Sequence, residues 1–319
     1  MSARLAIGVD AGGTKVAGLL VDVSAGEILD RRHVDTPAAD GEASALTIVS
    51  VAQDLAKGHQ DVIALGVGAA GIVSLEGVMR YAPNVAWREF PLKERIHAAV
   101  GLPTMVDNDA NVAAWGEFRF GAGRGSNDML LVTVGTGIGG GIVAGGKLFR
   151  GSHGFAAEIG HIIVEPGGPI CGCGNRGCWE QVASGRAVGR LGREAAQDRP
   201  DSLLAELAGG DPDAVTGLVV TTAAKRGDGI AVAVLAEVGR RLGEGIAGLV
   251  NVIDPDIVVV GGGVIDAGEL LLGPARRFFR ESVEAPEHRP EVPIVAAAMG
   301  NDSGAVGAAD LAVLELTQP

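Results

Sequence analysis

Aromatic residues are scarce in this 319-residue sequence, which has 7 phenylalanines, 3 tryptophans and 1 tyrosine. Hydrophobic residues still make up 47% of the chain, so the core must be built mainly from Val, Ala, Leu and Ile. Basic residues are also in short supply, because 26 Lys and Arg stand against 39 Asp and Glu. The net charge of −13 argues against nucleic-acid partners and anionic membrane surfaces, since both require a basic face.

Long apolar segments are absent as well. No run approaches the roughly 18 apolar residues that cross a bilayer, and the first strand pattern, residues 4–10, follows Met1 without the segments of a secretion signal. These absences predict a cytoplasmic protein. Cysteine is rare too, and all three cysteines lie between residues 171 and 178. Because cytoplasmic proteins seldom form disulfides, this cluster favours metal ligation or redox chemistry.

Glycine, by contrast, is abundant, with 51 residues. Residues 1–35 predict a three-stranded antiparallel meander whose first turn is rich in glycine, and residues 128–151 repeat that order of strand, glycine turn and strand. The repeat predicts two related α/β halves, and we place the switch between them near residue 112. Hydrophobic spacing and end signals predict helices at 41–58, 90–103, 110–123, 231–253 and 304–316.

The first glycine turn, DAGGTK at residues 10–15, is a candidate phosphate site. It joins two strands, so its backbone N–H groups point into a concavity that suits phosphate oxygens. Asp10 suits a hard cation bound through water, and Thr14 offers a hydroxyl. An ordinary glycine hairpin explains the motif equally well. The turn is no P-loop, because a strand follows where a P-loop requires a helix.

Two further glycine turns follow predicted strands. VGTGIGGG at 134–141 matches the G-x-G-x-x-G pattern of dinucleotide-binding proteins. Such a turn must open a helix, whereas the residues that follow here predict a hairpin strand, so a dehydrogenase is disfavoured. The third turn, GGG at 261–263, leaves room for a base or a ribose against bare backbone.

The cysteine cluster predicts a zinc site. One imidazole and three thiolates form the Cys3His set of tetrahedral zinc, supplied here by His161, Cys171, Cys173 and Cys178. Three buried cysteines without a metal are the alternative, while redox chemistry would favour a C-x-x-C pattern, which is absent. Four protein ligands leave no open coordination position, and this predicts a structural ion.

Carboxylates flank the predicted zinc site on both sides. Zinc would fix the ring of His161 and leave its second N–H free to donate to a ligand. Glu158 lies three residues before His161, and Glu180 lies two residues after Cys178. Two carboxylates and an oriented imidazole could clamp the vicinal hydroxyls of a sugar.

The motif VDNDAN at 106–111 offers a carboxylate for chemistry. Asp107 and Asp109 lie where a strand joins a helix, and the helix N-terminus would hold Asp109 ionised. An ionised Asp109 could accept a hydroxyl proton during phosphoryl transfer, or it could be a simple helix cap, a place that Asn108 could also take. Asn108 and Asn84 carry amides that suit neutral polyols, although an isolated loop asparagine is usually a turn residue.

The order of seven motifs resembles that of the ROK family of sugar kinases and repressors: DAGGTK, GAAG, APNVAW, DNDAN, VGTGIGGG, EIGHIIVEP and CGCGNRGCWE. Within the family, the bacterial glucokinases are the most similar. The resemblance implies an α/β fold of the actin-like ATPase (ribonuclease H-like) type, with two lobes and a cleft between them. Residues 1–112 with 302–319 would form the small lobe, and residues 113–301 the large lobe with the zinc loop and most of the nucleotide site.

The resemblance also implies a role for each motif. It makes Asp109 the general base. It implies hexose contacts from Gly71, Asn84, Asn108, Asp109, Glu158, His161 and Glu180. It assigns structural Zn²⁺ to His161, Cys171, Cys173 and Cys178. It assigns ATP with Mg²⁺ to the three glycine turns, through Asp10, Gly12, Gly13, Thr14, Lys15, Gly135, Thr136, Gly137, Gly261, Gly262 and Gly263. Family members commonly form homodimers or homotetramers.

The implied activity is transfer of the γ-phosphoryl group of ATP to the 6-hydroxyl of glucose. Fructose, mannose, N-acetylglucosamine and N-acetylmannosamine remain alternative acceptors, because a single hydroxyl contact can separate such sugars. Polyphosphate remains an alternative donor. Repressors of the family carry an N-terminal winged helix, for which the residues before Asp10 leave no room, so that role is disfavoured.

Overall fold

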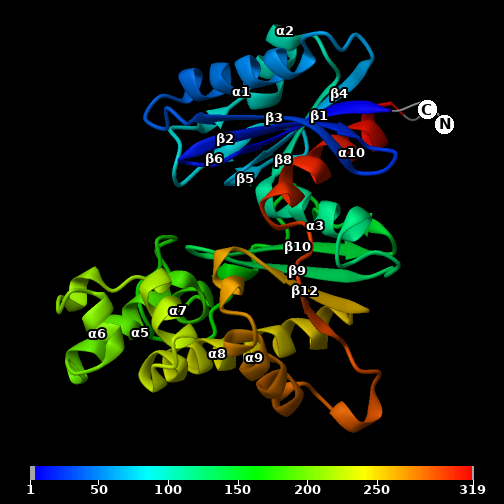
Figure 1. The fold of residues 1–319 in the computed structure, drawn as a ribbon. Helices are drawn as coiled ribbons and strands as arrows, with labels where there is room; N and C mark the ends of the chain where they lie inside the picture. The colour runs from blue at the N-terminus through cyan, green and yellow to red at the C-terminus, as the bar shows by residue number, and fades with distance from the viewer. Residues whose placement is uncertain (1–3, 318–319) are drawn as a thin grey trace. The chain divides into compact units, whose positions relative to one another are not determined.

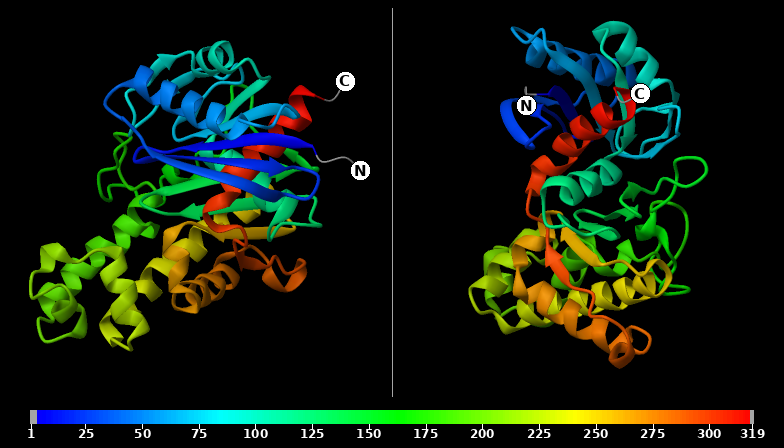
Figure 2. Two further views of the ribbon diagram at one scale, coloured as in Figure 1. Left: turned by 45° about the horizontal axis from the view of Figure 1, so that its top comes forward. Right: turned by 90° about the vertical axis from the view of Figure 1, so that its right-hand side faces the viewer.

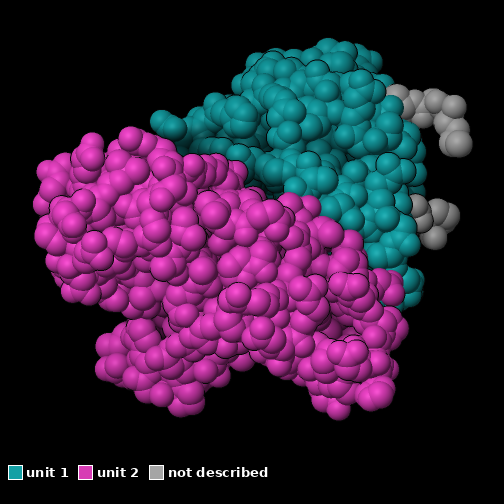
Figure 3. All heavy atoms as spheres, turned by 60° about the horizontal axis from the view of Figure 1, so that its bottom comes forward, with its two compact units in different colours: residues 1–131, 141–157, 297–319 teal, residues 132–140, 158–296 magenta. Residues whose placement is uncertain are grey.

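Residues 4–317 are described by the computed structural model, and the chain divides into two units that Figure 3 colours separately. Unit 1 comprises residues 1–131, 141–157 and 297–319, and unit 2 comprises residues 132–140 and 158–296. Within the described range, no helix is both long enough and apolar enough to cross a membrane.

Unit 1 is built on a mixed sheet with the strand order β3-β2-β1-β4-β8 (Figure 1). β1 pairs antiparallel with β2, and β2 with β3, which confirms the predicted meander. β1 pairs parallel with β4, and β4 with β8, so the carboxyl ends of these three strands lie at one edge of the sheet. The bounds are β1 Leu5–Ala11, β2 Lys15–Asp22, β3 Glu27–Asp35, β4 Val62–Ala69 and β8 Thr104–Asn108.

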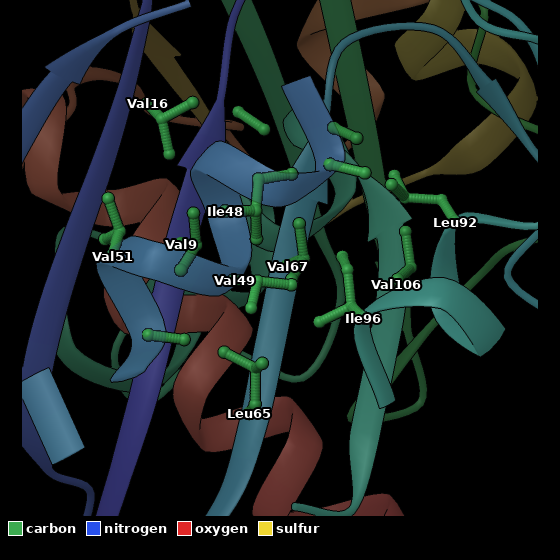
Figure 4. Packing of buried hydrophobic residues seen from close by; sticks show 14 of the residues in the cluster. Val9, Val16, Ile48, Val49, Val51, Leu65, Val67, Leu92, Ile96 and Val106 are labelled. Carbon is green, nitrogen blue, oxygen red and sulfur yellow. The ribbon is translucent and has the colours of Figure 1, made fainter. Parts of the chain in front are cut away.

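Two helices cover one face of this sheet and enclose an aliphatic core. They are α1 (Gly41–Ala56) and α2 (Leu92–Val100), both close to their predicted ranges. Side chains of β1 and β4 that point to this face pack against Ile48 and Val51 of α1 and Ile96 of α2 (Figure 4). The core therefore has the Val, Leu and Ile character that the composition predicts.

The opposite face is covered by α3 (Asp109–Phe120) and α10 (Ser303–Leu316), which lie side by side in Figures 1 and 2. Successive strand residues point to opposite faces, and Gly8 and Gly66 point toward α10. A Cβ on either would lie 1.7 or 1.9 Å from a backbone carbonyl of α10. Glycine therefore lets the last helix of the chain lie directly on β1 and β4.

A second five-stranded sheet has the order β11-β10-β9-β12-β13. Its strand β10 already begins at Ile138, so the turn predicted over 134–141 is confined to residues 135–137, and the predicted length was wrong. The reason is packing: Gly141 lies within β10, where a Cβ would be 2.4 Å from the Cβ of Ala114 in α3. The bounds are β9 Met129–Val134, β10 Ile138–Ala144, β11 Lys147–Leu148, β12 Ile257–Gly261 and β13 Ile294–Ala296, and a small separate sheet holds β5 Ile72–Val73, β6 Met79–Tyr81 and β7 Arg88–Phe90.

Unit 2 is rich in helices, of which only α8 (Gly229–Ile253) matches a predicted range. α8 packs along α9 (Glu269–Ser282), because Gly239 and Gly243 let the carbonyls of α9 approach closely. The other helices are α4 Glu180–Ala183, α5 Gly185–Asp198, α6 Leu203–Leu207 and α7 Gly217–Lys225. Short 3-10 segments are η1 Ile159–His161, η2 Pro212–Ala214, η3 Gly263–Ala267, η4 Pro286–His288 and, in unit 1, η5 Gly300–Asp302.

The division into units differs from the lobe boundary that the sequence predicts near residue 112. Residues 113–131 group with unit 1, because α3 packs along α10. The two units reflect how the chain packs, whereas the lobe bounds come from the resemblance to the ROK family. The lobe bounds therefore stay a prediction.

Candidate active site

Two carboxylates lie on one face of the unit 1 sheet, at its carboxyl edge. Asp10 is next to the end of β1 and stands opposite Gly68 of β4. Gly68 points toward the start of α3, where its Cβ would lie 3.5 Å from the Cα of Asp109. Gly304 of α10 completes the surroundings, since its Cβ would lie 3.7 Å from the carboxyl carbon of Asp10. The sheet register therefore brings Asp10 and Asp109 together.

Burial changes the acidity of both groups. Burial raises the pKa of Asp10 to about 6, and the charge of Asp109 acts in the same direction, whereas Lys15 opposes the shift. Burial also raises the pKa of Asp109. The N–H of Ala110 donates to Oδ1 of Asp109 over 2.9 Å and opposes this shift. We expected the helix N-terminus to hold Asp109 ionised, but burial outweighs it. The result is a more basic carboxylate than an exposed aspartate.

The cap of α3 is Asn108 rather than Asp109. The Oδ1 of Asn108 accepts from the N–H of Ala110 over 2.9 Å and of Asn111 over 3.1 Å, while its Nδ2 donates to the carbonyl of Gly71 over 3.0 Å. Gly71 has a φ of 142°, and a Cβ there would lie 2.3 Å from the carbonyl oxygen of Tyr81. Asn108 thus joins Gly71 to the start of α3 and caps the helix, and Asp109 shares with it only the N–H of Ala110.

The first glycine turn lies beside Asn84. The N–H of Gly12 donates to the carbonyl of Lys15 over 3.0 Å, and a Cβ on Gly13 would lie 2.5 Å from the Cβ of Asn84. Asn84, Thr14 and Lys15 are exposed. β2 follows directly at Lys15, as predicted when a P-loop was excluded.

In unit 2, the four predicted zinc ligands come together. Their ligand atoms all lie within 4.8 Å of one another. The Sγ atoms of Cys173 and Cys178 are 3.6 Å apart, and the Sγ of Cys171 lies 3.6 Å from Nδ1 of His161. Ligands of a tetrahedral zinc ion are separated by about 3.5–3.8 Å, given bond lengths of about 2.0–2.3 Å. The four side chains therefore fit a Cys3His zinc site.

Packing on α8 holds the cysteine segment in place. Gly177 has a φ of 74°, and a Cβ there would lie 1.7 Å from the carbonyl oxygen of Glu165. Trp179 is fully buried against Gly245, and its Nε1 donates to the carbonyl of Arg241 over 2.9 Å. A glycine and a buried tryptophan thus fix a segment that has little regular secondary structure.

Glu180 connects the zinc site to the second glycine turn. Its Oε1 lies 3.0 Å from the Sγ of Cys171, and a Cβ on Gly137 would lie 2.3 Å from its Oε2. His161 is close to the same turn, because a Cβ on Gly160 would lie 2.1 Å from the carbonyl of Ile138. Glu158, just before η1, is exposed.

The other glycine turn of unit 2 meets this one. Gly262 has a φ of 87°, and a Cβ there would lie 2.5 Å from the carbonyl oxygen of Val134. The N–H of Gly185, at the start of α5, donates to the carbonyl of Gly135 over 2.8 Å. Gly185 was not among the residues predicted from the sequence. The signal available was the small-residue run ASG after the last cysteine, which precedes a helix of mixed composition.

Comparisons with known proteins cover nearly the whole chain. The profile of the ROK family matches residues 6–315. A glucokinase of Streptomyces coelicolor is 45% identical over 311 residues, 97% of each chain, and a glucokinase of Halalkalibacterium halodurans is 40% identical over 314 residues, 96% of this chain and 94% of that one.

A solved structure has a similar level of sequence identity to this chain. The ROK family glucokinase from Streptomyces griseus, in complex with glucose and AMPPNP, is 47% identical with a TM-score of 0.87, over 96% of this chain and 98% of that chain. This likeness confirms the predicted α/β fold of the actin-like ATPase type. The protein belongs to the ROK family.

Proposed function

We propose that this protein is a glucokinase, which transfers the γ-phosphoryl group of ATP to the 6-hydroxyl of glucose. Near full-length similarity to glucokinases supports this, including one whose structure holds glucose and AMPPNP. The observation that carries the proposal is Asp109, a carboxylate of raised pKa at the carboxyl edge of the unit 1 sheet.

In the proposed reaction Asp109 accepts the proton of the sugar hydroxyl. A general base works best when its pKa lies near the working pH, because it must be ionised and yet hold a proton well. Burial moves Asp109 in that direction. Asn108 keeps α3 capped and linked to Gly71, so the carboxylate starts from a fixed backbone. Phosphoryl transfer then depends mainly on position and on neutralised charge.

We propose hexose contacts from Gly71, Asn84, Asn108, Asp109, Glu158, His161 and Glu180. With Nδ1 of His161 directed at Cys171, Nε2 remains to donate to a sugar hydroxyl. Glu180 and Glu158 can accept from hydroxyls. Zinc, when bound by His161 and the three cysteines, fixes the orientation and tautomer of this imidazole.

We propose that the three glycine turns bind the nucleotide. Their residues are Asp10, Gly12, Gly13, Thr14, Lys15, Gly135, Thr136, Gly137, Gly261, Gly262 and Gly263. Asp10 would face the Mg²⁺ that accompanies ATP and neutralises phosphate charge. Burial, and next the charge of Asp109, raise the pKa of Asp10, and a cation there would offset that charge. The exposed hydroxyl of Thr14 and amine of Lys15 are available to phosphate oxygens.

We further propose a cytoplasmic homodimer or homotetramer with the lobes 1–112 plus 302–319 and 113–301. Light scattering on the purified protein tests the oligomer, and a monomer at micromolar concentration would reject it. The functional test is coupled ADP release over a panel of hexoses and N-acetylhexosamines. Glucose should give the highest kcat/KM, and a better rate with another sugar would redefine the acceptor. Transfer from polyphosphate releases no ADP, so that donor is tested by formation of glucose 6-phosphate, and a higher rate than with ATP would redefine the donor.

A further inference from the structure

An ion-pair network in unit 1 lies directly beside Asp109. Arg150, in the segment that follows β11, places its Nε 2.5 Å from Oδ2 of Asp107. Nη2 of Arg150 lies 2.7 Å from Oε1 of Glu315, near the end of α10. The guanidinium therefore joins three elements, namely β8, α10 and the segment after β11.

Asp107 carries this interaction to the start of α3. Its side chain is almost completely buried, and it accepts from the N–H of Asn108 over 2.7 Å and from Nδ2 of Asn111 over 2.9 Å. Both donors belong to the cap and first turn of α3, the turn that begins with Asp109. The Asp107 carboxylate thus fixes the peptide group just before the cap.

The segment that carries Arg150 is itself held in place. The N–H of Ala156 donates to the carbonyl of Arg150 over 3.1 Å. Gly154 has a φ of 92°, and a Cβ there would lie 2.6 Å from the carbonyl oxygen of Val73 in β5. Close packing of this kind restricts where the arginine backbone can move.

Charge gives the network a second effect. Asp107 and Asp109 are two residues apart, and Asp10 is close to Asp109. A buried carboxylate without a partner is costly, and its field acts on neighbouring acids through a medium of low dielectric. Arg150 supplies the opposite charge for Asp107, so that Asp107 does not disfavour the ionised form of Asp109.

We propose that Arg150 is a positioning residue for the base: its guanidinium neutralises Asp107 and holds the Asp107–Asn108 peptide, and this keeps Asp109 in place and ionised. The inference rests on the proposed function. Arg150 lies outside the glycine and zinc motifs of the sequence, and only the fold brings it to β8.

A small pocket makes the inference testable by chemical rescue. It has a volume of about 170 Å³ and is lined by residues that include Ser74, Asp107, Arg150, Gly154 and Glu315. In Arg150→Ala, guanidinium from solution could enter at this pocket and replace the lost group. Urea has the same size and no charge, so it is the matched control.

The first measurement is kcat for Arg150→Ala against wild type at saturating glucose and ATP. We expect a loss of about 30-fold or more, because a charge pair is broken beside the base. Guanidinium at millimolar concentration should restore at least about a fifth of the wild-type rate, and urea should not. Arg80→Ala is the control, since the Arg80–Glu89 pair of unit 1 is exposed.

The second measurement is a double-mutant cycle with Asp109→Asn. If Arg150 acts through Asp109, its replacement costs little further rate once Asp109 is an amide. Asp107→Asn together with Arg150→Ala should recover much of the rate, because no buried charge is left unpaired. Should Arg150→Ala fail to fold, Arg150→Gln, which removes the charge but keeps polar atoms at the position, takes its place in the cycle.

Rates within threefold of wild type for Arg150→Ala would overturn the inference, as would losses that simply multiply in the cycle. Either result leaves the proposed function standing if wild type releases ADP in the presence of glucose and Asp109→Asn does not. A wild-type protein without sugar-dependent ADP release overturns both.

Discussion

The proposed functional residues of unit 1 and those of unit 2 are positioned in different ways. In unit 1, Asp10 and Asp109 are placed by sheet register and by glycines that let α3 and α10 approach. In unit 2, His161 and Glu180 lie on a segment of short turns, held by three cysteines and the buried Trp179. In unit 1 a regular sheet, its covering helices and the Arg150–Asp107 pair fix a buried base, whereas an irregular segment needs a metal to fix an imidazole.

This comparison predicts that damage to the two groups of residues has different kinetic signatures. Changes to Asp109 and its partners in unit 1 should lower kcat, because we propose that this carboxylate accepts the proton of the reacting hydroxyl. Changes to His161, Glu180 or the zinc ligands in unit 2 should raise the KM for glucose, because we propose that His161 and Glu180 bind the sugar.

The largest effect is expected from Asp109→Asn. Loss of the base should lower kcat by about 10²–10⁴-fold while the affinity for glucose is largely kept. Steady-state kinetics and glucose titration measure the two quantities. Asp35→Asn, at an exposed position on β3, is the matched control. A kcat within tenfold of wild type would remove Asp109 from the role of base.

Next in size is Cys173→Ser, which removes one zinc ligand. Metal affinity should fall by about 10–100-fold and the KM for glucose should rise, since His161 loses its orientation. Elemental analysis and kinetics test this on the same preparation. Ile170→Ser changes an exposed side chain of the same segment and should leave both values unchanged. If the metal is lost and KM stays constant, the zinc site does not support the sugar site.

Asp10→Asn tests the electrostatics of unit 1. The pKa of Asp10 is raised to about 6, so the folded protein binds its proton more tightly than the unfolded chain does. The contribution of Asp10 to the free energy of unfolding therefore falls as pH rises from about 4 through 6. Asn should raise the free energy of unfolding by about 1–3 kcal/mol at pH 7 without nucleotide, and the gain should vanish near pH 4.

Urea unfolding at both pH values measures this difference, with the exposed Asp61→Asn as control. An equal effect at pH 4 and pH 7 would mean that Asp10 is not the titrating group. Kinetics on the same variant should show weaker use of Mg·ATP, because the proposed cation contact is lost.

The smallest effect is expected from Gly137→Ala. The added methyl group would meet Oε2 of Glu180, and displacement of that carboxylate should raise the KM for glucose about 3–10-fold. Gly248→Ala adds the same group where nothing lies within 4 Å and is the control. An unchanged KM for glucose would show that Glu180 can move without cost to the sugar.

Much of the site could be predicted because its residues lie in short motifs. The spacing of His161 and the three cysteines specified the zinc site, and the meander followed from alternating strand patterns. The helices α5 and α9 were not predicted, because three glycines interrupt the first and Pro274 lies within the second. Their apolar faces are set by packing within unit 2, which local propensity does not record.

The acidity of Asp109 and the partners of Asp107 were also beyond the sequence. A helix N-terminus lowers the pKa of a carboxylate, and only the fold shows that burial is the larger effect here. Gly137 matched a nucleotide motif, yet the space beside it is taken by the carboxylate of Glu180, a residue distant in sequence. Such contacts join residues that are far apart in the sequence, so a local sequence pattern does not reveal them.

The most direct test of the account is the dissociation constant for glucose in two proteins, Asp109→Asn with its metal and wild type stripped of metal. We predict that Asp109→Asn binds glucose about as tightly as wild type, without turnover, and that the stripped protein binds it much more weakly. Tight binding by the stripped protein, or loss of binding in Asp109→Asn, would contradict the proposal that unit 1 supplies the base and that the zinc site of unit 2 supports sugar binding.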